Sequence, residues 1–349
     1  MRAGVSVVVP AYNAQATLTD CLSALRAAMG PDDELILFDD GSTDQTGSIA
    51  AAAGARVLNE TKPAQGPAHG RNQAARTASR NRLLFVDADV ILHNDAIDLL
   101  AREMDSGGAV AAFGSYDDRP RSLRATSLYA NLRHHFVHQH GQHDATTFWS
   151  GIGMIETQAF LDAGGYNDVM FRHPSIEDVD LGMRLKAKGH RISLVPEAQG
   201  THAKDWSLWQ VWHTDVMRRA LPWSCLIADG AAAPADLNLA KAERRLAILA
   251  LALPTLLLVA VFWWGAAVAA LAAVMLYLFG NRHFFGFLTR RLSPGQLIVA
   301  AMMHWCYHMY ASITFASVLI ATRFGLRRAS TRLPVLSLSR NLGEERAWP

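Results

Sequence analysis

Strand-like and helix-like segments alternate along the first part of the chain, and this order constrains the fold more than any other feature. Residues 5–9 form a valine-rich run typical of a strand that is buried on both faces. The same reasoning predicts strands at residues 34–38, 56–58 and 82–86, and helices at residues 14–28, 44–53 and 66–79. A β-α-β-α-β-α-β order calls for an α/β fold with a mostly parallel, doubly wound sheet.

Polar motifs follow three of the predicted strands. "PAYN" (10–13) follows the first strand and "DDGSTD" (39–44) follows the second. "DAD" (87–89) follows the strand predicted at residues 82–86. Ligands of such sheets bind beyond the carboxyl ends of the strands, so we expect these loops to converge. Asp39 and Asp40 precede a glycine turn, where they can accept hydrogen bonds from a ribose or a base. The chain lacks GxGxxG and GxxxxGK[ST], which excludes a Rossmann nicotinamide site and a P-loop.

Two carboxylates, Asp87 and Asp89, interrupt the apolar stretch "RLLFVDADVIL" (82–92). Side chains alternate along an extended segment, so both carboxylates point to the same side. Such a pair suits Mg²⁺ or Mn²⁺, which take oxygen ligands and keep positions open for substrate phosphates. The motif predicts a site for a metal and a diphosphate, and a solvated acidic loop is the alternative.

A second acidic pair, Glu177 and Asp178, opens a helix predicted at residues 176–188. The helix dipole favours carboxylates in a first turn, which suffices to explain Glu177. Asp178 is instead a candidate general base that faces the cleft. Upstream, "FWSGIGMIE" (148–156) mixes aromatic, small and polar residues, and it predicts either the wall of an acceptor pocket, with Trp149, or a buried strand.

Histidines are concentrated in residues 133–143. His134 and His138 are one helical turn apart, a spacing that can bind zinc. No HExxH pattern accompanies them. A polar lining of an acceptor cleft or of a lipid headgroup site is therefore the preferred interpretation.

The C-terminal third is strongly apolar. Residues 246–279 carry no charged side chain, and as one helix they would be about 50 Å long against a hydrocarbon core of about 30 Å. Two tryptophans and a glycine near the middle favour a tight turn, with a single tilted helix bent at Pro254 as the alternative. Residues 281–291 resemble an interfacial amphipathic segment. We predict membrane spans at residues 246–262, 265–279 and 297–322.

The arginines that flank these spans give conflicting orientations. Arg244 and Arg245 precede the first span and are predicted to be cytoplasmic. Three spans would place the last arginines, Arg323, Arg327 and Arg328, on the other side. Either the number of crossings is even, or one segment is re-entrant, or these arginines break the positive-inside rule.

The N-terminal residues, the cysteines and the net charge predict the location and the partners of the protein. The N-terminus lacks a signal peptide, and three scattered cysteines without CxxC fit a reduced compartment. We expect a multi-pass protein of the inner (cytoplasmic) membrane, with a cytoplasmic domain at residues 1–230 and a membrane region at residues 231–349. A net charge of +2 implies no nucleic-acid partner.

Four motifs together resemble a known family. "VVVPAYN", "DDGSTDQT", "VDADV" and "SIEDVDLGMRL" have the order and rough spacing of the inverting family 2 glycosyltransferases, over about residues 5–200. The resemblance is to membrane-anchored members. It implies a GT-A fold with a Rossmann-like mixed sheet, a nucleotide-diphospho-sugar donor (a UDP-sugar is favoured), and Mn²⁺ or Mg²⁺.

The resemblance also implies roles for individual residues. Asp178 would be the catalytic base. The nucleotide-sugar site would contain Pro10, Tyr12, Asn13 and Asp40 with the neighbouring Asp39, and also Asp87. The metal ligands would be Asp89, Asp87 and His202. The Q-x-x-R-W motif of processive synthases is absent, because Gln210 is followed by Val-Trp-His-Thr. Arg218 and Arg219 lie in the analogous region, and with Trp149 and Glu177 they are candidate contacts for the acceptor or the diphosphate.

The implied reaction is non-processive transfer of a sugar to a lipid or lipid-linked acceptor at the membrane. One alternative is a polyprenyl-phosphate glycosyltransferase that makes a lipid-linked sugar donor, since a phosphate acceptor needs no strong base. A nucleotidyltransferase would normally show a glycine-rich basic loop after the first strand, and "PAYNAQAT" lacks one. A non-catalytic scaffold is disfavoured because all the acidic motifs are intact.

Overall fold

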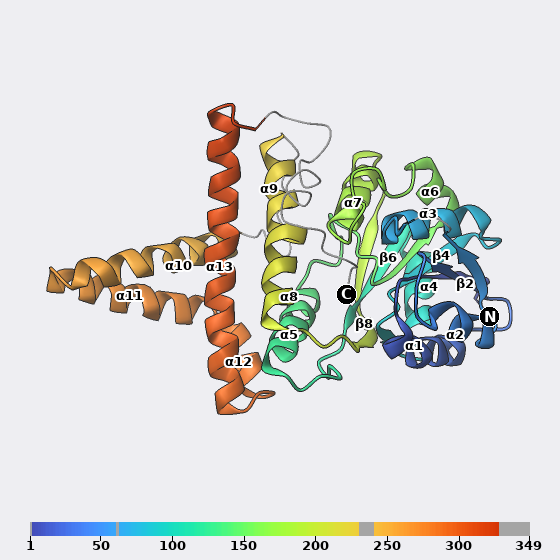
Figure 1. Ribbon diagram of the computed structural model, residues 1–349, viewed down its shortest axis with the longest axis horizontal. Coiled ribbons are helices and arrows are strands. Elements are labelled where there is room, and N and C mark those ends of the chain that lie inside the picture. Colours follow the sequence, from blue (N-terminus) through green and yellow to red (C-terminus); the bar gives the residue numbers. More distant parts are fainter. Residues whose placement is uncertain (1, 61–62, 230–240, 328–349) are drawn as a thin grey trace. The chain divides into compact units, whose positions relative to one another are not determined.

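The computed structural model describes residues 2–60, 63–229 and 241–327, which form two compact units (Figure 1). Within these ranges, the first unit contains residues 2–122 and 138–205, and the second contains residues 123–137 and 206–327. We describe each unit by itself. The predicted boundary at residue 230 differs from this division, because residues 206–229 belong to the second unit.

The first unit is built on an eight-stranded sheet with the order β3-β2-β1-β4-β7-β6-β8-β5. Strands β1 to β4 pair in parallel, whereas β7 pairs antiparallel with both β4 and β6, so the sheet is mixed. The parallel half is the part that the sequence predicted. The strands are β1 (Ser6–Ala11), β2 (Glu34–Asp39), β3 (Arg56–Asn59), β4 (Arg82–Val86), β5 (Val90–Leu92), β6 (Ala111–Tyr116), β7 (Ile152–Glu156) and β8 (Ile192–His202).

Helices cover both faces of this sheet. Val7 and Val9 belong to the core that α1, α2 and α4 cover, whereas Val8 belongs to the core under α3, α6 and α7. Alternate residues of a strand face opposite sides, so a strand between two helical layers needs apolar residues at nearly every position. The helices are α1 (Gln15–Ala28), α2 (Thr46–Ala52), α3 (Pro67–Thr77), α4 (Ala96–Gly107), α6 (Thr157–Asp162) and α7 (Glu177–Ala187).

The second unit is helical. Leu128 and Leu132 of α5 are buried with Val211, Leu288 and Met303 in one apolar cluster, which ties α5 and α8 to the C-terminal helices. This cluster explains why residues 206–229 group with those helices. The elements are α5 (Ala125–Gln139), α8 (Leu208–His213), a π-helix η1 (Thr214–Ala220), α9 (Leu221–Ala228), α10 (Lys241–Ala260), α11 (Trp264–Gly280), α12 (Arg282–Thr289) and α13 (Pro294–Arg323).

The tight turn in the apolar region is confirmed. Helix α10 ends at Ala260 and α11 begins at Trp264, so the alternative of one continuous helix is wrong. No helix of the described chain is by itself both long and apolar enough to cross a membrane, although α11 and α12, bent by 67°, together meet that requirement. The parts of the predicted membrane region at residues 231–240 and 328–349, Arg328 included, lie outside the described residues.

Candidate active site

The three polar motifs meet at one edge of the sheet, as predicted. Strands β2, β1 and β4 are adjacent and parallel, and their carboxyl ends carry the three loops. Asn13 joins two of the loops, since its N–H donates to Ser42 Oγ and its Oδ1 accepts from Thr43 N–H, each at 2.9 Å. The Thr17 hydroxyl donates to the carbonyl oxygen of Ala88 in the third motif at 3.0 Å. Pro10 lies in β1, and Tyr12 follows it.

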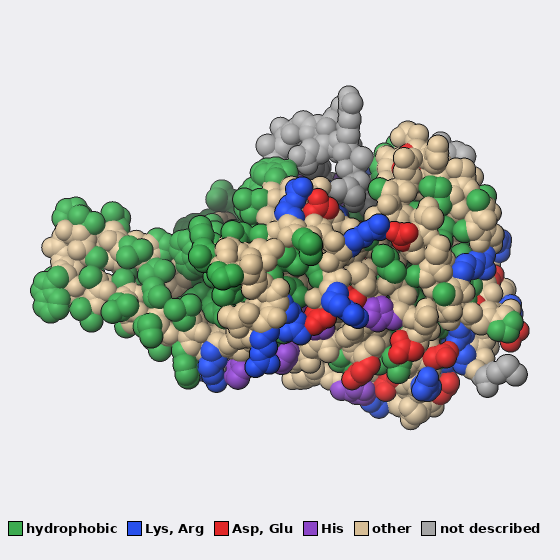
Figure 2. Space-filling view, turned by 90° about the horizontal axis from the view of Figure 1, so that it is seen from below, with side chains coloured by type: hydrophobic (Ala, Val, Ile, Leu, Met, Phe, Trp, Pro, Cys, Tyr) green, Lys and Arg blue, Asp and Glu red, His purple; other side chains and the backbone are tan. Residues whose placement is uncertain are grey.

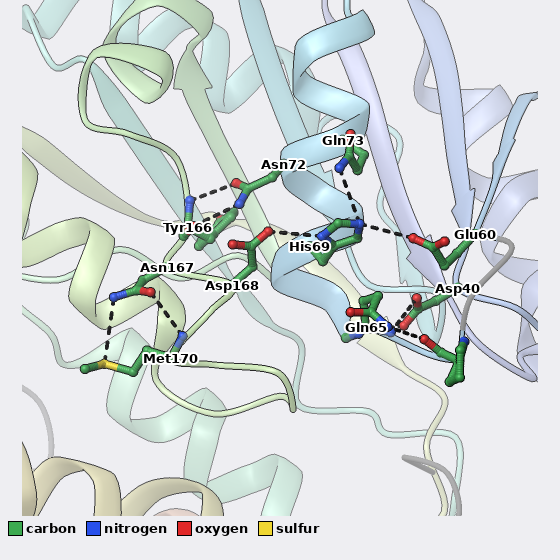
Figure 3. A network of polar contacts seen from close by, with 12 residues as sticks. Asp40, Glu60, Gln65, His69, Asn72, Gln73, Tyr166, Asn167, Asp168 and Met170 are labelled. Carbon is green, nitrogen blue, oxygen red and sulfur yellow. Dashed lines mark hydrogen bonds and ion pairs between the residues drawn. The ribbon is translucent and has the colours of Figure 1, made fainter. Parts of the chain in front are cut away.

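Asp40 is buried and fixes the segment that leads into α3. Its two carboxylate oxygens accept the N–H groups of Gln65 and Gly66 at 2.8 and 2.7 Å (Figure 3). Burial raises the pKa of Asp40 above its usual range. Gly66 has φ +94°, and a Cβ there would lie 2.0 Å from the carbonyl oxygen of Arg172, so the turn requires glycine. Asp39 has a local role, because its Oδ1 accepts the N–H of a turn residue.

Helix α3 contacts two loops through polar side chains (Figure 3). His69 lies between two carboxylates, with Nδ1 3.1 Å from Asp168 Oδ2 and Nε2 3.3 Å from Glu60 Oε2. Asn72 exchanges two hydrogen bonds of 2.8 Å with the backbone of Tyr166. These contacts hold the end of β3 and the segment before α7 against the same helix.

Asp89 and His202 form an acid–imidazole pair. Pairing of β5 with β8 places Val90 opposite His202, which brings the imidazole Nε2 to 3.4 Å from Asp89 Oδ2. The imidazole stacks on Tyr116, with ring centroids 4.3 Å apart. Burial alone would raise the pKa of Asp89, but His202 and Lys204 lower it to about 2. Asp89 is therefore ionised at neutral pH.

Arg71 joins the two acidic motifs. Its guanidinium is buried, with Nη2 2.6 Å from Asp87 Oδ1 and Nη1 3.2 Å from Glu177 Oε1. Burial raises the pKa of Asp87, and the charge of Arg71 opposes that effect. Arg71 was not predicted from the sequence. The available signal was a lone arginine within the alanine-rich segment "PAHGRNQAA", a costly residue to bury without an acidic partner.

Asp178 has the properties of a general base. Its Oδ1 accepts the N–H of Val179 at 2.8 Å and its Oδ2 that of Ser150 at 3.3 Å. Burial and the neighbouring Glu177 raise the pKa of Asp178 to about 7, against the opposing charge of Arg71. Glu177 accepts hydrogen bonds from Arg71 and from a backbone N–H, so its role in this structure is to hold the motif.

The segment before β7 lies against the helix that carries Asp178. Trp149 packs edge-on against Tyr116 and His138, with ring centroids 4.9 and 5.0 Å apart. At Gly182 of α7, a Cβ would lie only 2.4 Å from the backbone nitrogen of Phe148. The buried-strand prediction for "FWSGIGMIE" is confirmed for its second half, which is β7, whereas the wall of an acceptor pocket stays a prediction.

Two other predicted features are the His134–His138 pair and the Arg218–Arg219 pair. His138 Nδ1 contacts the carbonyl oxygen of Gly114 at 3.0 Å, and in the part of the chain that the structure describes no three His, Cys, Asp or Glu side chains are arranged to hold a metal. The geometry gives no support to zinc at His134 and His138. Arg218 and Arg219 belong to η1 in the second unit, where Arg219 pairs with Asp215 at 3.1 Å.

A divalent cation suits the donor set at Asp89. The side chain is an oxygen ligand that is ionised at neutral pH, and the His202 imidazole beside it is a second suitable ligand. Asp87 is engaged by Arg71. Two protein ligands leave the other positions of such an ion open to diphosphate oxygens and water, as Mg²⁺ sites commonly do.

Comparisons with known proteins identify a family and several similar chains. Residues 6–163 match the model of the family "Glycosyl transferase family 2". The chain is 28% identical over 215 residues to the uncharacterized protein MT1568 of Mycobacterium tuberculosis. That alignment covers 55% of this chain and 64% of MT1568. The chain is 32% identical over 117 residues to the glycosyltransferase GlyG of Streptococcus pneumoniae, covering 32% and 38%. The alignments thus span less than two thirds of these relatives.

One similar structure covers most of the chain. The mannosyltransferase PcManGT from Pyrobaculum calidifontis, in complex with GDP-Man and Mn²⁺, aligns over 90% of this chain and 88% of its own. The TM-score is 0.59 and the sequence identity is 19%. The two proteins therefore share a fold, and this confirms the predicted GT-A architecture.

Proposed function

We propose that this glycosyltransferase, which carries a family 2 domain at residues 6–163, transfers a sugar from a nucleotide-diphospho-sugar to a hydroxyl of its acceptor with inversion. The observation that carries the proposal is Arg71, which ties Asp87 of one acidic motif to Glu177 of the other. It thereby holds the candidate donor site beside Asp178, whose pKa of about 7 suits a general base.

The proposed reaction is a single displacement. Asp178 takes the proton of the acceptor hydroxyl while the hydroxyl oxygen bonds to the anomeric carbon. The bond from that carbon to the diphosphate oxygen breaks on the opposite side, and the nucleoside diphosphate leaves with the bonding electrons. One displacement inverts the anomeric configuration. The half-protonated state of Asp178 near neutral pH allows it to accept this proton and release it between turnovers.

The donor would lie at the edge where the three loops meet. Tyr12, Asn13 and Asp39 would contact the nucleotide, with Pro10 lining the same pocket, and Asp40 holds the adjoining segment. Asp89 and His202 would hold Mn²⁺ or Mg²⁺. Such an ion, when bound, offsets the charge that develops on the leaving diphosphate. A UDP-sugar is the favoured donor.

The acceptor is proposed to be a lipid or a lipid-linked sugar at the inner membrane, with the first unit on the cytoplasmic side. Exposed apolar helices of the second unit support this location. A base with a pKa of about 7 is useful for a hydroxyl and unnecessary for an ionised phosphate, which favours a hydroxyl over polyprenyl phosphate. Trp149 would contact the acceptor, and Arg218 and Arg219 an acidic group of the acceptor or the diphosphate.

The first test is release of nucleoside diphosphate from a panel of UDP- and GDP-sugars, with Mn²⁺ and with EDTA. We expect release with Mn²⁺, and a decrease of about 100-fold or more for Asp89→Ala, since a ligand of the charge-stabilising ion is lost. Asp95→Ala, an exposed acid on the following segment, is the matched control. Wild-type release by Asp89→Ala would refute the metal assignment, and release of pyrophosphate from a nucleoside triphosphate would indicate a nucleotidyltransferase.

A further inference from the structure

We propose that the α10–α11 hairpin, residues 241–280, inserts into an anionic bilayer without crossing it, while α13 lies along the membrane surface. The inference rests on the membrane location proposed above and changes its form, from three crossings to a re-entrant anchor. Four properties of the second unit carry it: the apolar surface of the hairpin, its attachment to α13, its length, and the charges at its base.

The hairpin exposes apolar side chains at its tip and along both of its helices. Phe262 and Trp264 at its tip are 86% and 78% exposed, and Leu258, Leu271 and Met275 along its length are each more than half exposed. Figure 2 shows hydrophobic side chains over this projecting end and no charged ones. A helical hairpin with this much exposed apolar surface is expected in a protein core or in a membrane, and α12 and α13 pack only on its base.

Both ends of the hairpin are fastened to the middle of α13. His308 lies between Tyr277 of α11 and Glu243 of α10, with its Nδ1 2.8 Å from the Tyr277 hydroxyl and its Nε2 3.0 Å from Glu243 Oε2. Trp305 donates to the carbonyl oxygen of Ala250 at 3.3 Å. Helix α13 runs across the base of the hairpin (Figure 1). When the hairpin points into a bilayer, α13 therefore lies along the surface.

The opposite side of α13 packs on a charged helix. The Tyr310 hydroxyl donates to Asp215 of η1 at 2.6 Å, and beyond the end of α13 Arg327 pairs with Asp229 at 2.7 Å. Asp215 also binds the buried Arg133 at 3.0 Å. A helix bonded in this way to ionised side chains is poorly suited to lie among lipid chains, but it suits an interface where one face is polar and the other apolar.

The hairpin is too short to reach the far side. From Ala250, which contacts α13, to Phe262 at the tip is about 12 residues, or about 18 Å, against a hydrocarbon core of about 30 Å. The turn can be buried in lipid, because the N–H groups of Val261, Phe262 and Trp263 all donate to carbonyl oxygens of α10. We therefore place the tip within the bilayer.

Basic residues lie where the hairpin leaves the bilayer. Arg244 precedes the apolar stretch, and Arg282, Arg290 and Arg291 of the α12 region follow it, all with exposed side chains. Their charge complements acidic lipid headgroups. A re-entrant hairpin also leaves Arg323 on the same side as the others, which removes the conflict that three crossings create.

Cysteine accessibility tests this topology in membrane vesicles of either orientation. Starting from Cys306→Ser, which removes the exposed cysteine among the described residues, Trp264→Cys and Phe324→Cys are each labelled with a membrane-impermeant maleimide. We expect Phe324→Cys to react only from the cytoplasmic side and Trp264→Cys to react only after detergent. Labelling of Trp264→Cys from the far side would show that the hairpin crosses the bilayer, and labelling from the near side would show that it is not inserted. Labelling of Phe324→Cys from the far side would show three spans. Each would overturn the proposal.

Flotation with vesicles tests the lipid partner. Trp264→Asp is expected to lower binding to vesicles with acidic phospholipid at least tenfold, and Arg290→Glu with Arg291→Glu to lower it several-fold for acidic but not for zwitterionic vesicles. Unchanged binding, or a hairpin that is instead covered by a second copy of the chain in solution, would refute the proposal. Donor turnover in detergent is expected to persist in Trp264→Asp. If the wild type binds the vesicles but shows no donor turnover, the proposed function alone is refuted.

Discussion

Replacing Asp178 with asparagine is expected to lower kcat for sugar transfer by about 10²–10⁴-fold, the range that a general base contributes. Asparagine is close in size and its amide oxygen can still accept the N–H of Val179, but its NH2 group cannot accept the N–H of Ser150 and the side chain cannot take a proton. We therefore expect the affinity for the donor to change little. The measurement is initial rate at saturating donor and acceptor, with the donor Kd from titration.

The pH dependence gives Asp178 a second signature. The carboxyl group must be ionised to act as a base, and its pKa is about 7. The wild-type rate should thus rise with pH through about 7 and fall off on the acidic side, and this acidic limb should be absent from the residual rate of Asp178→Asn.

The control is Asp180→Asn on the same helix, where the carboxylate pairs with Arg184 at 2.8 Å near the surface. Its rate should remain within a few-fold of wild type, because it contacts neither acidic motif. A wild-type rate and pH profile for Asp178→Asn would remove its assignment as the base, and an equal loss in Asp180→Asn would show that the effect comes from the helix as a whole.

The second large effect is expected for Arg71→Met. The substitution leaves Asp87 and Glu177 without their shared cation, and removing one partner of a buried ion pair costs about 3–5 kcal/mol. The free energy of unfolding, measured in urea, should fall by about that amount. Because Arg71 opposes the rise in the pKa of Asp178, activity that survives should require a higher pH.

Arg76→Met, an exposed position on the same helix, is the matched control and should change stability by no more than about 0.5 kcal/mol. Arg71→Lys separates charge from geometry, since an ammonium group can pair with one carboxylate but lacks the two-pronged guanidinium. If Arg71→Met unfolds at the same urea concentration as Arg76→Met, the ion pairs of Arg71 contribute nothing to the free energy of unfolding.

The parallel half of the fold was predictable because its residues are determined locally. Strand β1 lies between two helical layers, so its valines are needed on both faces and mark it in the sequence. The later strands were harder to predict. Strand β7 enters antiparallel between β4 and β6, and that choice depends on pairing between residues far apart in the chain. Residues 123–137 likewise join the second unit through contacts with helices more than 150 residues later.

The site was predictable where an acid lies at the end of a strand, and not where its partner comes from elsewhere. Asp89 was identified in this way, whereas Asp178 was identified as a first-turn acid of a predicted helix. His202 followed only from the resemblance, and Arg71 was missed, since each meets its acid through the fold. Asp40 is a further difference: its carboxylate oxygens hold the backbone before α3, a role that no local pattern indicates.

The close approach at Gly182 limits how this protein can vary. The backbone of Thr147 and Phe148 lies where any side chain larger than hydrogen would project, so α7 and the segment that carries Trp149 fit together as one piece. An engineer who alters that segment, the proposed acceptor contact, is expected also to displace Asp178, the proposed base. Variants with new acceptor preferences should therefore arise more readily from substitutions outside residues 147–150 than from within them.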